Sequence, residues 1–232
     1  MTLTLIVILA VSGALIVGAL WGCYGKLPSN VEGFVVALAG GALIISAVLE
    51  LIQPALEEAP QVQVFAAVLV GALVFIFADW LVKKRWGSNS GGGLLAAITL
   101  DGVPENLALG VALISSEPLA VAALSGSIFL SNLPEAAGGA KQMASSGYSK
   151  GKVMLVWSMT ALLLSAAALV GNVALEGVSS HYLALIQCFA GGAVVASLAT
   201  EVFPAAFKEA SYRTGIATAI GLILALYLNQ LA

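Results

Sequence analysis

The sequence contains the hexapeptide LDGVPE at residues 100–105 and a second version of it, LSNLPE, at residues 130–135. Each copy places a Pro-Glu pair inside a segment that is otherwise apolar enough to cross a lipid bilayer. An ionisable side chain at membrane depth costs about 2.5–3.5 kcal/mol by insertion scales, and a proline leaves one helical carbonyl without its hydrogen bond. Because both costs recur in matching positions, we interpret the two stretches as half-sites that face each other across a polar site in the membrane.

The composition of the 232-residue chain is that of a polytopic membrane protein. Hydrophobic residues make up 60% and charged residues 9%, and the mean hydropathy is +1.04, whereas soluble domains carry about 25% charged residues. A soluble fold of this size could not bury so much apolar surface. The small net charge of −3, without a basic cluster that contains aromatic residues, predicts no nucleic-acid partner. Cys23 and Cys188 lack the spacing of metal ligands, and we expect buried, unreactive thiols.

Apolar segments of about 20 residues, the length that spans a bilayer, predict an all-α fold. Proline and glycine residues separate these segments, and every connection is short. We therefore expect one transmembrane domain over residues 1–232. The eight expected helices cover residues 3–24, 31–56, 62–82, 93–115, 118–141, 151–174, 181–206 and 213–231.

The charges between these segments predict the orientation of the chain. All nine Lys and Arg residues lie at the odd-numbered loops, whereas the charged residues of the even-numbered loops are all acidic. By the positive-inside rule the odd-numbered loops face the cytoplasm, and both termini lie outside. We expect an integral protein of the plasma (inner) membrane.

A second internal repeat relates the second and seventh expected helices. The tetrapeptide AGGA at residues 39–42 recurs at residues 190–193, an offset of 151, and the same offset relates Glu50 to Glu201. The two segments would cross the membrane in opposite directions, so the copies are inverted. Inverted repeats whose interrupted helices meet near the midplane are typical of secondary transporters.

The polar residues of the two hexapeptides could bind a divalent cation. Asp101 and Glu105 are four residues apart and share one helix face, as do Ser131 and Glu135. Pro104 and Pro134 free carbonyls, and Asn106 and Asn132 add amide oxygens. Two such faces opposed would form a cage of oxygen ligands suited to a divalent ion. The alternative is that these acids are protonated and hydrogen-bonded to each other.

Two further acids, Glu50 and Glu201, each precede a proline by three or four residues. We expect them, together with Asn106, to act as a gate or as a second coordination shell. The alternative for both is a place at a helix end near the membrane interface.

With these motifs and this repeat, the chain resembles the zinc/iron-permease (ZIP) family of metal-ion transporters over essentially its whole length. Residues 101–110, DGVPENLALG, look like the family's helix-4 signature His-Asn-x-Pro-Glu-Gly-Leu-Ala, and residues 131–135 look like its helix-5 signature. The resemblance implies a binuclear metal site between these helices, with Glu105 and Glu135 as metal ligands. It also implies an elevator mechanism, in which the first, fourth, fifth and sixth helices slide against the other four.

The chain departs from the family pattern in ways that bear on the ion. Asp101 stands where the family usually has histidine, Ser131 replaces His or Gln, and Asn132 occupies a position that is commonly acidic. The one histidine, His181, is expected at an external helix end. Because carboxylate and carbonyl oxygens suit harder ions, we expect Mn²⁺ or Fe²⁺ to be carried as well as Zn²⁺.

The predicted function is the transport of a divalent metal ion toward the cytoplasm, with metal ion and lipid bilayer as partners and no organic cofactor. A carrier for protons or a small organic cation is the alternative, and an intramembrane enzyme or a receptor is a weaker one. We predict no enzyme, because the chain has no His-Glu-x-x-His helix and no Ser-His pair. The oligomeric state is open, and a homodimer is one alternative.

Overall fold

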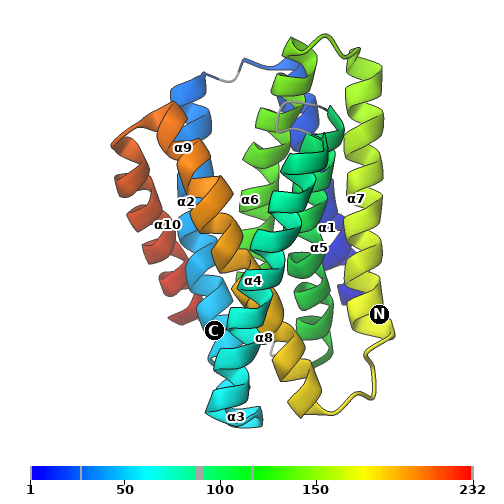
Figure 1. Ribbon diagram of the computed structural model, residues 1–232, viewed down its shortest axis with the longest axis vertical. Coiled ribbons are helices and arrows are strands. Elements are labelled where there is room, and N and C mark those ends of the chain that lie inside the picture. The colour runs from blue at the N-terminus through cyan, green and yellow to red at the C-terminus, as the bar shows by residue number, and fades with distance from the viewer. Residues whose placement is uncertain (1, 27, 87–90, 116–117, 231–232) are drawn as a thin grey trace.

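The computed structural model describes the backbone of residues 2–26, 28–86, 91–115 and 118–230. Within these ranges the regular structure is entirely helical, and the helices pack side by side into one elongated bundle (Figure 1). In chain order the helical segments are α1 (Thr2–Tyr24), α2 (Ser29–Ser46), η1 (Ala47–Ile52), α3 (Ala55–Glu58), α4 (Gln61–Trp86), α5 (Gly91–Ser115), α6 (Pro118–Ser145), α7 (Lys150–Val173), α8 (Ser180–Ser197), η2 (Leu198–Val202), α9 (Phe203–Ala210) and α10 (Arg213–Gln230).

These segments confirm the all-α prediction of eight helices. The second helix runs through α2, η1 and α3, and the seventh runs through α8, η2 and α9. In the described residues, five helices are long and apolar enough to cross a membrane: Thr4–Tyr24, Ser29–Glu58, Gln61–Arg85, Lys150–Val173 and Ser180–Ala210. The sequence did not predict that η1 and η2 are π-helical. In a π-helix each backbone hydrogen bond joins residues five apart, instead of four as in an α-helix.

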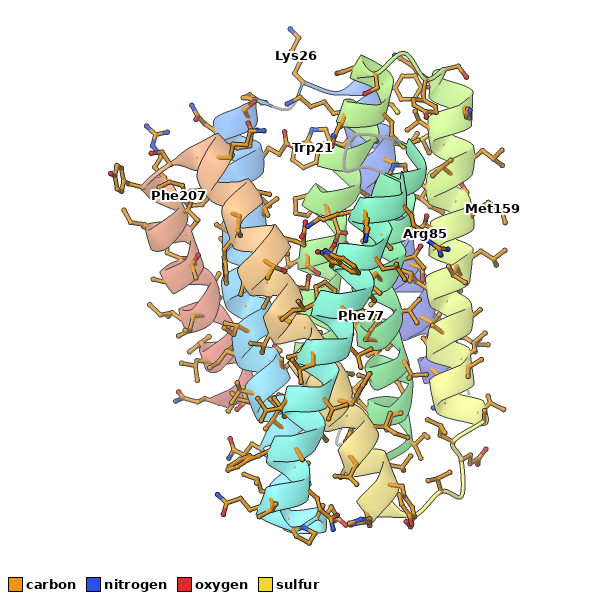
Figure 2. All side chains as sticks on the ribbon, viewed as in Figure 1. Trp21, Lys26, Phe77, Arg85, Met159 and Phe207 are labelled. Atoms are coloured by element: carbon orange, nitrogen blue, oxygen red, sulfur yellow. The ribbon has the colours of Figure 1, made fainter. Side chains whose placement is uncertain are left out.

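The connections divide between the two ends of the bundle. In Figure 1 the links from α1 to α2, from α6 to α7 and from α9 to α10 lie at the upper end, and α3 and the link from α7 to α8 lie at the lower end. Lys26, in the first of these links, projects from the upper end in Figure 2. The three links beside Lys26, Lys150 and Arg213 therefore lie at one end, which we call the basic end.

The helices pack most extensively within two groups. In the first group α1 packs on α6 and α7, and α5 packs on α7. The backbones approach closely at glycine: a Cβ on Gly22 would lie 2.1 Å from the Ala137 carbonyl oxygen, and one on Gly171 would lie 2.4 Å from that of Leu107. Small residues allow such close packing between helices in membranes.

The second group contains α2, α4, α8 and α10, with α2 packed on α10 and α4 packed on α8. Its close approaches occur in matching pairs. A Cβ on Gly41 would lie 2.0 Å from the Thr218 carbonyl oxygen, and a Cβ on Gly192, 151 residues later, would lie 2.0 Å from that of Val68. The same correspondence relates Gly71, against Phe189, to Gly221, against Leu38.

The structure thus confirms the repeat found in the sequence. Ser29–Ser46 and Ser180–Ser197 are α-helical segments of 18 residues each, and each continues directly into a π-helical segment. Figure 1 shows that α2 descends from the basic end, whereas α8 ascends toward it. The copies are therefore inverted, and each half supplies the helix on which the other half's glycine face packs.

Large apolar side chains cover much of the outside of the bundle. Phe77 on α4 and Met159 on α7, both labelled in Figure 2, are 63% and 56% exposed. Leu69 and Leu73 on α4 are exposed to a similar degree. A surface of this kind is suited to contact with lipid rather than with water.

Candidate functional site

A cavity of about 660 Å³ lies between the two helix groups. At its outer limit it is lined by exposed residues near the basic end, among them Ser29 on α2, Ser145 on α6 and Lys208 on α9. At its inner limit it is lined by Glu105, which is only 7% exposed. The cavity therefore connects the basic end of the bundle with a buried carboxylate.

The two Pro-Glu pairs contribute to the same cavity from neighbouring helices. Glu105 lines it from α5, and Pro134 and Glu135 line it from α6. Both prolines lie inside continuous helices. Ser131, one turn before Glu135, also lines the cavity, and its hydroxyl donates to the Ile128 carbonyl at 3.0 Å. Three of the five predicted metal ligands thus share one cavity.

The two asparagines of the predicted site make backbone contacts instead of lining the cavity. The Asn132 amide donates to the Val11 carbonyl on α1 at 3.2 Å, and the side chain is 2% exposed. The Asn106 amide donates to the Gly102 carbonyl of its own helix at 2.9 Å. Both buried amides thus have a backbone partner: Asn132 joins α6 to α1, and Asn106 bonds within its own helix.

Asp101 lies within α5, but its side chain is outside the described residues. Among the side chains that are described, no three His, Cys, Asp or Glu residues come together as a metal-binding group. Asp101 as a metal ligand remains a prediction from the sequence.

The predicted gate residues occupy equivalent places in the two π-helical segments but have different partners. Glu201 in η2 lines the cavity and pairs with Lys83 of α4, whose ammonium also lies 2.9 Å from the Asp79 carboxylate. Glu50 in η1 is 7% exposed and accepts a 2.7 Å hydrogen bond from the Asn229 amide. The 150-residue offset of α4 and α10 relates Asp79 to Asn229. The i, i+4 spacing of Asp79 and Lys83 could have indicated their pairing from the sequence, whereas the contacts of Glu201 and Glu50 could not be read from it.

A further ion pair in the cavity was not predicted. Lys141 on α6 and Glu32 on α2 both line it, with the ammonium nitrogen 2.9 Å from the carboxylate oxygen Oε2. The distribution of loop charges predicts only a cytoplasmic position for Lys141. Because the partner lies 109 residues away in the chain, its identity depends on how α2 and α6 are rotated.

His181 and the two cysteines lie apart from the cavity lining. His181 is the second residue of α8, and its Nδ1 lies 3.3 Å from the Glu58 carbonyl oxygen. Cys23 and Cys188 are buried free thiols, as expected.

The charge of the cavity lining favours cations. Its described carboxylates are Glu32, Glu105, Glu135, Glu201 and Glu209, and its described lysines are Lys141 and Lys208. A cleft lined mainly by one sign of charge concentrates ions of the opposite sign.

Comparisons with known proteins do not assign the chain to a family. No model of a known protein family matches the sequence, and no curated protein shows significant similarity to it. The resemblance to ZIP transporters therefore rests on the residues of the two Pro-Glu motifs and on the inverted repeat.

Proposed function

We propose that this chain is a ZIP-like membrane transporter that carries divalent metal cations toward the cytoplasm. The observation that supports this proposal best is the acid-lined cavity that runs from the basic end of the bundle to Glu105 and Glu135. The basic end would face the cytoplasm by the positive-inside rule, so the cavity would be the route by which an ion leaves the site.

The chemistry of the lining favours a hard or borderline divalent ion. Carboxylate oxygens from two helices, with a serine hydroxyl beside them, match the ligands that Mn²⁺, Fe²⁺ and Zn²⁺ accept. A doubly charged ion would offset the cost of two carboxylates in a site of low dielectric constant. In this proposal Glu105 and Glu135 bind the ion, and Ser131 and Asp101 complete its oxygen shell.

Transport by alternating access is supported by the arrangement of the helices. The cavity is lined on one side by α5 and α6, from the first group, and on the other by α2, α8, η2 and α9. In a protein built of inverted halves, the cavity between the two helix groups can open toward either side of the membrane in an equivalent way. The first group would carry the ion as a block that slides against the second.

A carrier for a small organic cation is the second candidate. A volume of about 660 Å³ lies within the usual range of small-molecule sites, about 300–1,000 Å³, and exceeds what a bare metal ion needs. The same carboxylates would then pair with an ammonium group.

Uptake into proteoliposomes would test the proposal. The wild-type protein should accumulate Zn²⁺, Mn²⁺ or Fe²⁺, and both Glu105→Gln and Glu135→Gln should reduce the rate at least tenfold, because each removes a charged ligand. Glu57→Gln, an exposed acid on α3 at the opposite end from the cavity mouth, is the matched control and should transport normally. Wild-type protein that neither transports nor retains any divalent metal on elemental analysis would contradict this assignment in favour of the organic-cation carrier.

A further inference from the structure

The ion pair between Glu32 and Lys141 connects the two helix groups at the wall of the cavity. Glu32 belongs to α2, whose main packing partners are α10 and α9, and Lys141 belongs to α6, whose main partner is α1. The ammonium and carboxylate are 2.9 Å apart, and their side chains are 38% and 17% exposed. Both side chains are therefore only partly exposed.

The Glu32 carboxylate lies against the backbone of the opposite group. A Cβ added to Gly138, which precedes Lys141 by one helical turn, would lie 2.5 Å from Glu32 Oε1. One carboxylate oxygen thus rests on a glycine while the other pairs with the lysine. A side chain at position 138 would displace the carboxylate from this place, so the present geometry of the pair depends on the register of α6 against α2.

The corresponding positions in the other half of the molecule are apolar. The 151-residue offset relates Glu32 to Leu183 on α8, and the 30-residue offset of the Pro-Glu motifs relates Lys141 to Val111 on α5. Leu183 and Val111 are buried, 6% and 0% exposed, and their helices pack together. The contact between the two helix groups therefore differs at the two ends of the bundle. It includes an ion pair where the cavity opens and apolar side chains at the other end.

We propose that Glu32 and Lys141 form a latch that favours the arrangement in which the cavity opens at the basic end. The latch rests on the proposed sliding of the two groups. A slide of one helical turn, about 5.4 Å, would remove Gly138 from the carboxylate and break the pair. Partly exposed ion pairs contribute about 0.2–1 kcal/mol, enough to change the balance of two arrangements by up to about fivefold without locking either.

Two serines related by the repeat provide reporters for the two arrangements. Both side chains are largely buried, Ser197 5% and Ser46 3% exposed, but Ser197 lines the cavity, whereas Ser46 does not and is hydrogen-bonded to Ser127 at 2.7 Å. In a background without Cys23 and Cys188, Ser197→Cys should react with a fluorescent maleimide faster than Ser46→Cys. The ratio of the two rates measures which end of the bundle is open.

Removing either side of the latch should lower this ratio. We expect Glu32→Gln and Lys141→Met each to reduce the rate at Ser197→Cys relative to Ser46→Cys about two- to fivefold. The exchanged pair Glu32→Lys with Lys141→Glu should recover most of the loss. Lys208→Met and Glu209→Gln remove the same charges from elsewhere in the cavity lining and should leave the ratio unchanged.

Three results would overturn the latch: an unchanged ratio in both single variants, an equal fall in the controls, or a joint rise at both reporters, which indicates general loosening. The labelling is done without any transported ion. A failure here therefore leaves the proposed metal transport standing, and a failure of metal uptake leaves this result standing.

Discussion

The residues proposed to hold the ion offer oxygen as the ligand atom. Glu105, Ser131 and Glu135 share the cavity, and Asp101 is the predicted fourth member. Oxygen ligands discriminate poorly between first-row divalent ions, whereas an imidazole favours zinc and its neighbours in the Irving–Williams order. Selectivity in this chain should therefore depend on the absence of histidine from the two Pro-Glu turns.

Asp101→His tests this point. The substitution places a nitrogen ligand one helical turn before Glu105, so it should raise zinc uptake relative to manganese uptake by several-fold. Competition uptake with both ions, in wild type and variant, measures the ratio. Glu57→His, at an exposed position on α3 away from the cavity, is a control for the introduction of histidine elsewhere. An unchanged zinc-to-manganese ratio would show that Asp101 is not a ligand.

At the scale of the helices, the glycine contacts determine how closely the second group packs. Gly221 and Gly215 lie in the same helix, α10, yet they meet different surroundings. A Cβ at Gly221 would lie 1.8 Å from the Leu38 carbonyl oxygen, whereas one at Gly215 would meet nothing within 4 Å. The two positions form a natural pair for measuring what close backbone approach contributes.

Gly221→Ala should separate α10 from α2 and destabilise the protein by about 1–3 kcal/mol, the usual cost of overpacking. Gly215→Ala should be neutral or stabilising by up to about 1 kcal/mol, because alanine favours the helix. Thermal unfolding in detergent measures both. Equal melting temperatures for Gly221→Ala and wild type would mean that the two helices can separate at little cost.

The sequence predicted the number and place of the helices well because each contains an apolar run, but it ended the third, fifth and seventh helices four residues early, because these helices continue into charged and polar residues. It did not predict η1 and η2, because the π-helical bonds depend on tertiary packing, such as that of η1 on α8. The shared cavity of Glu105 and Glu135 was indicated by the repeated motif. The pairing of Lys83 with Glu201, 118 residues apart, was not indicated by the sequence. It depends on how two helices are rotated, which no local pattern specifies.

At the scale of the whole molecule, the proposed transport cycle requires the two helix groups to move relative to each other. Ser46 on α2 and Ser127 on α6 form a hydrogen bond across the boundary, with their hydroxyl oxygens 2.7 Å apart. Ser12 on α1 and Ser165 on α7 form an equally short hydrogen bond inside the first group. Cysteines at these two pairs would cross-link across the boundary or within one group.

Oxidation of the double variant Ser46→Cys with Ser127→Cys should stop metal uptake, because the disulfide joins the groups, while metal binding persists. Oxidation of Ser12→Cys with Ser165→Cys should leave uptake intact. Uptake before oxidation, after it and after reduction is the measurement. Full uptake by the oxidised boundary variant would rule out sliding at the interface of α2 and α6.

The exchange of packing partners between the halves has a consequence for biosynthesis. The glycine face of α2 packs on α10, and Gly41 meets Thr218, 177 positions later in the chain. At roughly 5–20 residues per second, the ribosome needs about 9–35 s to supply that partner. In the proposed membrane protein, the glycine face of α2 would stay uncovered throughout this interval, and α4 would likewise lack its partner until α8 is made. Neither half can complete itself, so assembly finishes only when the last helix inserts.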